Sequence, residues 1–93
     1  MNLQETDRVL TFAAIFDRRK VEEPDVLAWQ TMLEDYTEDD CMAAVKEHYS
    51  SETRWLMPAD VIRIAGLREL IRADRLERGI APEPLVRNLR SVG

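Results

Sequence analysis

The chain has little of several residue types that would point to a particular class of protein. Its single cysteine, Cys41, cannot form a disulfide within the chain, which is typical of proteins from a reducing cytosol. Three glycines and few β-branched residues disfavour an all-β fold. No apolar run approaches the roughly 18 residues of a membrane span, and the acidic first residues do not resemble a signal peptide. We therefore expect a cytoplasmic protein.

Candidate catalytic and metal-binding residues are also scarce. Cys41 and His48 share a helix face seven residues apart, but zinc needs three or four ligands and no second cysteine or histidine is present. A Cys–His nucleophile pair is disfavoured, because two helical turns separate these residues by about 10 Å. The acidic cluster Glu38-Asp39-Asp40 lacks the spacing of a calcium loop and suits a helix N-terminus. The sequence therefore predicts no enzymatic activity, no cofactor and no bound metal.

The sign of the charge changes along the chain. Residues 1–60 hold six basic and fourteen acidic residues, whereas residues 61–93 hold seven arginines and four acidic residues. Hydrophobic residues make up 45% of the 93 positions, enough for one modest core. We therefore predict a single domain with a helical body over residues 1–66 and a basic helical arm and tail over residues 67–93.

Apolar residues recur at helical spacing in four segments, which run over about 4–17, 24–35, 38–50 and 58–78. Pro58 suits the first turn of the last helix, and Gly79 suits the position just after its end. Gly66 lies inside that helix and would allow a break there. The predicted fold is all-α, a small bundle of four helices, the last one long and Pro-initiated, with a flexible C-terminal tail.

Two local patterns predict structural roles. Thr37 followed by Asp40 resembles a capping box at the start of the third helix. Trp29 lies on the apolar stripe of the second helix and is expected in the core. Trp55, together with Leu56 and Met57, is expected to clamp the fourth helix onto the body.

Arg68, Arg72 and Arg75 recur at i, i+4 and i+7 and form a basic stripe on the fourth helix. Two interpretations stay open, a solvated face with local ion pairs and an edge that binds a partner. Three arginines neutralise few phosphates, so nucleic-acid binding through them alone should be weak and sensitive to salt. The second and third helices superficially resemble a helix-turn-helix, but Glu38-Asp39-Asp40 would face the phosphates.

Four sequence motifs follow one another in a recognisable order. They are Ala-Ala-Ile-Phe-Asp at 13–17, Asp25-Val26-x-x-Trp29 followed by Leu33, Cys41-x-x-Ala44-Val45-x-x-His48-Tyr49, and Met57-Pro58-Ala59-Asp60-Val61-Ile62. Over about residues 5–66 this order resembles small helical proteins of actinobacterial phages and prophages. More distantly, it is similar to the N-terminal domain of phage replicative-helicase loaders.

The resemblance implies a phage DNA-replication adaptor that binds a DnaB-type replicative helicase and controls its loading in the host bacterial cytoplasm. Alternative functions are a small phage DNA-binding or transcription regulator, and a host-directed protein inhibitor. A homo-oligomer formed through the fourth helix is a further expectation. The residues expected to contact the partner are Arg68, Arg72, Arg75, Leu85, Val86 and Leu89.

Overall fold

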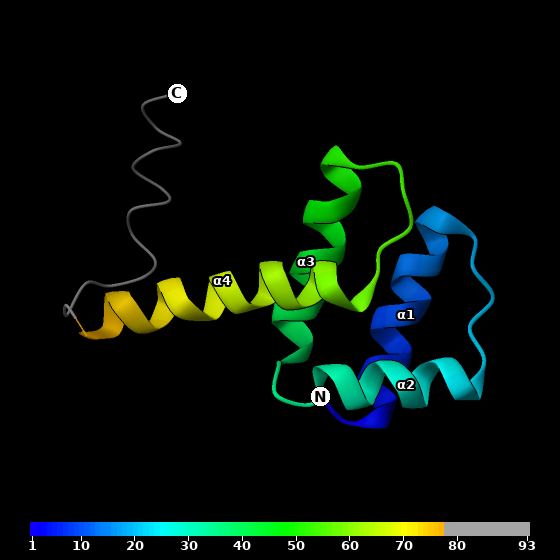
Figure 1. The fold of residues 1–93 in the computed structure, drawn as a ribbon, viewed down its shortest axis with the longest axis horizontal. Coiled ribbons are helices and arrows are strands. Elements are labelled where there is room, and N and C mark those ends of the chain that lie inside the picture. Colours follow the sequence, from blue (N-terminus) through cyan, green and yellow to red (C-terminus); the bar gives the residue numbers. More distant parts are fainter. Residues whose placement is uncertain (78–93) are drawn as a thin grey trace.

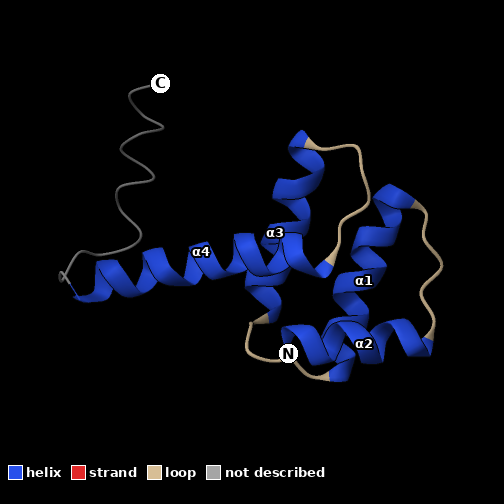
Figure 2. Cartoon of the chain, in the orientation of Figure 1, coloured by secondary structure: helices blue, strands red, loops and turns tan. Residues whose placement is uncertain are grey.

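The computed structural model of this protein describes residues 1–77. Four helices follow one another along the chain: α1 (Leu3–Asp17), α2 (Glu23–Leu33), α3 (Glu38–Ser51) and α4 (Pro58–Glu77). Every regular element in this part of the chain is a helix (Figures 1 and 2), which confirms the predicted all-α class. None of these helices is long and apolar enough to cross a membrane. The tail predicted to be flexible lies outside the described residues.

Side-chain caps determine where the helices begin. Asn2 accepts a hydrogen bond from the backbone N–H of Glu5, and the Glu5 side chain accepts one in return, which makes a complete capping box on α1. Thr37 caps α3 by accepting from the N–H of Asp40 at 3.2 Å. The predicted capping box is wrong in its second half, because the Asp40 carboxylate binds arginines of α4 instead.

The core lies where α1, α2, α3 and the first turns of α4 meet (Figure 1). The face of α3 predicted to be apolar is fully buried, His48 included. Only the first two turns of α4 contribute to the core, and the rest of the helix projects away from the body. The buried apolar residues are Val9, Leu10, Ala13, Trp29, Leu33, Cys41, Ala44, Val45, Leu56, Val61, Ile64 and Ala65.

The α4 helix is continuous through Gly66, so the break allowed by this glycine does not occur. The α4 helix therefore runs from the body into the arm without interruption. A Cβ atom at Gly66 would lie 3.8 Å from the hydroxyl oxygen of Tyr36, an ordinary packing distance. The absence of a side chain at this position is consequently not required by packing.

The two tryptophans have different environments. Trp29 is only 8% exposed and lies in the core, as predicted. The prediction for Trp55 is wrong, because this residue is 54% exposed and its neighbour Leu56 is fully buried. Successive side chains of an extended segment point in opposite directions, so burying Leu56 turns Trp55 outward. There the indole covers the guanidinium of Arg19 at 5.0 Å.

Candidate interaction surface on the α4 arm

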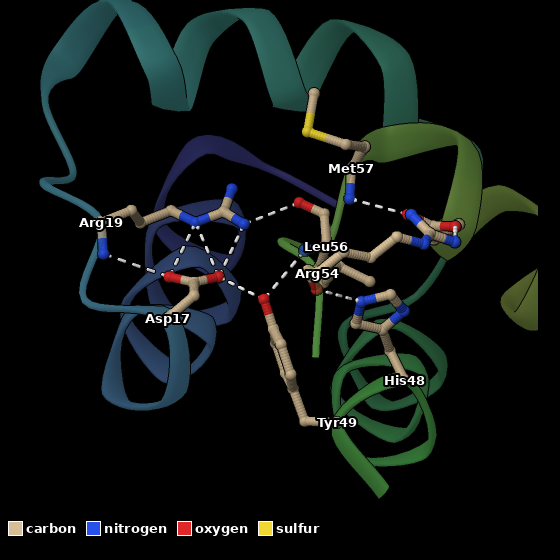
Figure 3. A network of polar contacts seen from close by, with 8 residues as sticks. Asp17, Arg19, His48, Tyr49, Arg54, Leu56 and Met57 are labelled. Carbon is tan, nitrogen blue, oxygen red and sulfur yellow. Dashed lines mark hydrogen bonds and ion pairs between the residues drawn. The ribbon is translucent and has the colours of Figure 1, made fainter. Parts of the chain in front are cut away.

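A polar network fixes the loop from which α4 starts (Figure 3). Arg19, just after α1, donates to both carboxylate oxygens of Asp17 and, at 2.6 Å, to the backbone carbonyl of Leu56. Tyr49 of α3 donates to Asp17 and accepts from the N–H of Leu56 at 2.8 Å. The network therefore ties both backbone polar groups of Leu56 to α1 and α3.

The charges of this network stabilise each other. Burial alone would raise the pKa of the Asp17 carboxyl, but hydrogen bonds from Arg19 and Tyr49 hold it below its usual value. Burial and the bond to Asp17 raise the pKa of Tyr49, so its hydroxyl stays protonated and remains a donor. The Arg19 guanidinium also lies 5.3 Å from the ring of Trp29, which adds a cation–π contact inside the junction.

A second cluster holds the first turn of α4. Asp60 accepts from the N–H of Met57 at 2.9 Å and from the guanidinium of Arg54 at 2.7 and 3.0 Å. These Arg54 hydrogen bonds lower the pKa of the Asp60 carboxyl far below its usual value. The carbonyl of Arg54 is in turn 2.8 Å from Nε2 of His48 (Figure 3). Together the two clusters fix the direction in which α4 leaves the body.

A third contact fastens the middle of α4 to the start of α3. Asp40 is 1% exposed, and its Oδ1 accepts from Arg68 at 3.1 Å and from Arg72 at 2.7 Å. Burial by itself would raise the pKa of this carboxyl, but the bonds from Arg72 and Arg68 hold it below its usual value. Arg68 and Arg72 follow buried Ile64 at i+4 and i+8, so they continue the body-facing side of the helix.

Arg68 and Arg72, both predicted to bind a partner, thus bind Asp40 within the molecule. Arg68 and Arg72 neutralise a buried carboxylate, a use that neither open interpretation of the stripe included. Arg75, one turn beyond Arg72, borders a shallow depression of about 220 Å³ together with both of them and Ile71. The predicted anchors Leu85, Val86 and Leu89 lie outside the described residues.

The feature of the arm that sequence reasoning underused is an apolar stripe. Leu67, Leu70 and Ile71 follow i, i+3, i+4 spacing on one face, and all three are largely exposed, Leu70 to 66%. This face lies beside the arginine side of the helix, and its Ile71 borders the same depression as the three arginines. The spacing was visible in the sequence, and the predicted body ended at residue 66, but local spacing does not show whether the apolar side of the arm is covered by other helices.

Cys41 and His48, the pair considered for catalysis or zinc binding, lie in the core. Burial raises the pKa of the Cys41 thiol to about 11, so it is protonated and poorly nucleophilic at neutral pH. His48 is buried and bonded to the Arg54 carbonyl. Cys41 belongs to the buried apolar cluster, and the ring of His48 packs edge-on against that of Tyr49 at 4.7 Å. The structure therefore gives them a packing role.

Comparison of the chain with models of known protein families, with curated proteins and with solved structures finds no match. The function has to be argued from the arm and the body themselves.

Proposed function

We propose that this protein is a phage DNA-replication adaptor that binds a DnaB-type replicative helicase in the host bacterial cytoplasm and controls its loading. The observation that carries the proposal is the outer half of α4, which projects from the body with an exposed apolar stripe of Leu67, Leu70 and Ile71. In this role the protein has no catalytic activity of its own, and its body serves to hold and orient the arm.

The composition of the arm supports a protein partner. An amphipathic helix docks by inserting residues at i, i+3, i+4 spacing into an apolar groove of its partner. Exposure of Leu67, Leu70 and Ile71 to water is unfavourable. Burial of each side chain in a partner would therefore contribute to the free energy of binding. Arg75 borders the same side of the arm and adds a charged rim, as is common around interface cores.

The ion pairs of the arm favour a protein partner over nucleic acid. Arg68 and Arg72 already share the Asp40 carboxylate, so both would have to exchange a buried partner for phosphate. A DNA-binding regulator therefore has fewer available cations than the arginine stripe suggests. A host-directed inhibitor would use the same apolar stripe, and differs from the adaptor in its partner.

The direct test is titration of purified replicative helicase with the full chain and with the double variant L67D/L70D. Both positions are exposed, so the body should fold unchanged while binding weakens by at least about tenfold, as buried charges without partners oppose docking. The matched control is Ile15→Asp, an equally exposed apolar position at the end of α1. Equal affinity of L67D/L70D and the unaltered chain would exclude the stripe as the contact.

The tail and the arginines require separate variants. A chain that ends at Ala81 tests Leu85, Val86 and Leu89, and we expect it to lose helicase binding while the melting temperature of the body stays the same. Reversing Arg68 and Arg72 to glutamate would place three carboxylates together and weaken the fold, so Arg75→Glu is the informative charge reversal. Absence of binding by every form, including the unaltered chain, would reject the helicase as partner.

A further inference from the structure

A second apolar surface lies on the body, far from the arm. A groove of about 330 Å³ runs between the first turns of α1 and α2. Leu3 and Leu27 in its lining are each nearly half exposed, and Val21 and Val26 are partly buried beside them. This groove therefore has an apolar floor that the rest of the described chain leaves uncovered.

The rim of the groove is acidic. Asp7 on α1 and Glu22 and Glu23 at the start of α2 line it, and all three are exposed. The two cations nearest in sequence are Lys20, which pairs with Glu22 at 3.2 Å, and Arg8, which pairs with Glu38 of α3 at 2.6 Å. A ligand that matches this surface combines apolar side chains with positive charge.

The chain itself contains a segment of that chemistry. Residues 84–93 hold the apolar residues Leu85, Val86 and Leu89, together with Arg87 and Arg90, and no acidic residue. The arginines of this segment are opposite in charge to the rim of the groove, and its apolar side chains match the apolar floor. Charge complementarity of this kind steers association and selects the partner.

The length of the chain determines which copy can supply this segment. Leu85 lies eight residues beyond Glu77, so a fully extended chain carries it at most about 28 Å from the end of α4. The 20 residues of α4 already span about 30 Å. The start of α2, which lines the groove, lies at the opposite end of the body from the tip of α4 (Figure 1). The molecule extends 43 Å along its longest axis, so Leu85 of the same molecule does not reach the groove.

We infer that the groove between α1 and α2 binds residues 84–93 of a second copy of this chain. A reciprocal exchange of tails fills both grooves and closes a two-fold dimer. The contact goes beyond the helicase proposal and uses the same tail, so it makes the tail unavailable to the helicase while the dimer persists. Dimerisation would then regulate access to Leu85, Val86 and Leu89.

Sedimentation equilibrium of the full chain over a range of concentrations tests the inference. We expect a dimer that dissociates with added salt, because screening weakens the attraction between the acidic rim and Arg87 and Arg90. Leu27→Asp should weaken the dimer at least tenfold. Ile15→Asp, at an exposed apolar position outside the groove, should leave it unchanged.

Mixing two variants gives the sharper result. Leu27→Asp has an intact tail and a damaged groove, whereas L85D/L89D has an intact groove and a damaged tail. Each alone should be largely monomeric, and the mixture should recover a heterodimer held by one intact contact. None of these substitutions touches the α4 stripe, so this outcome is separable from the helicase test.

Three results would overturn the inference. A monomer at all concentrations would exclude self-association. A dimer that resists Leu27→Asp but is lost in L67D/L70D would place the interface on α4 instead. Failure of the two variants to complement each other, with both folded by circular dichroism, would show that tail and groove do not bind each other.

Discussion

The junction before α4 and the outer half of α4 are built in opposite ways. At the junction, polar side chains from α1 and α3 satisfy both backbone groups of Leu56, whose side chain is fully buried. On the arm, Leu67 and Leu70 are exposed, and no described part of the chain covers them. The polar and apolar groups of the junction are satisfied within one molecule, whereas the arm exposes apolar side chains that a second molecule could cover.

The contrast shows how a small domain can present a helix in a fixed direction. At the first turn of α4, Asp60 pairs with Arg54. In the middle of α4, Arg68 and Arg72 pair with Asp40 of α3. These pairs orient the helix without requiring apolar cover on its outer face. The stability of the protein should therefore depend on the junction and on the ion pairs of Asp40, and hardly at all on the exposed apolar stripe of the arm.

The largest effect is expected at Leu56. Leu56→Ala should lower the free energy of unfolding by about 2–5 kcal/mol, because it opens a cavity in the core. Trp55→Ala, one residue earlier, should cost no more than about 1 kcal/mol, since it removes chiefly an exposed cation–π contact. Urea unfolding of the two variants measures both values. If Trp55→Ala lowers the free energy of unfolding as much as Leu56→Ala does, the indole is part of the core.

A smaller effect is expected at Tyr49. Tyr49→Phe keeps the ring that stacks on Phe16 and removes only the hydroxyl that bonds Asp17 and Leu56. Loss of this hydroxyl leaves polar partners unsatisfied, so we expect a loss of about 1–3 kcal/mol by thermal or urea unfolding. The control is Tyr36→Phe, at a tyrosine outside the network. No difference between the two would indicate that the network does not hold the junction.

Acid should loosen the arm through Asp40 and Asp60. The pKa values of both carboxyls are lower in the folded protein than in the unfolded chain, so their contribution is present above about pH 4. It is lost as the pH falls through the lower, folded-state values, and the melting temperature should fall with it. Asp40→Asn should flatten this dependence, and Asp39→Asn, at the exposed neighbouring position, serves as control. An unchanged acid profile in Asp40→Asn would contradict this role of Asp40.

The smallest effect concerns the link between body and arm. Gly66→Ala should stabilise the protein by about 0.5–1 kcal/mol, because alanine favours the helix and a Cβ fits beside Tyr36. Partner binding through the stripe should be unchanged or improved. A destabilised Gly66→Ala would show that α4 needs to bend at this position.

The amino-acid sequence by itself determined the helices and most of the core. The spacing of Cys41, Ala44, Val45 and His48 predicted the buried face of α3, and Pro58 marked the start of α4. These predictions succeed because helical periodicity and helix-start signals depend on residues within a few positions of each other.

Only the tertiary structure decided which surfaces are free. Whether Trp55 or Leu56 enters the core depends on the direction of the loop, and whether Arg68 and Arg72 meet solvent depends on where α3 places Asp40. Asp40 lies 28 residues before Arg68, a separation over which local spacing gives no information on distance. The exposure of Leu67 and Leu70 likewise depends on the direction of α3, which crosses α4 instead of running along it, so the outer half of α4 extends beyond α3 (Figure 1).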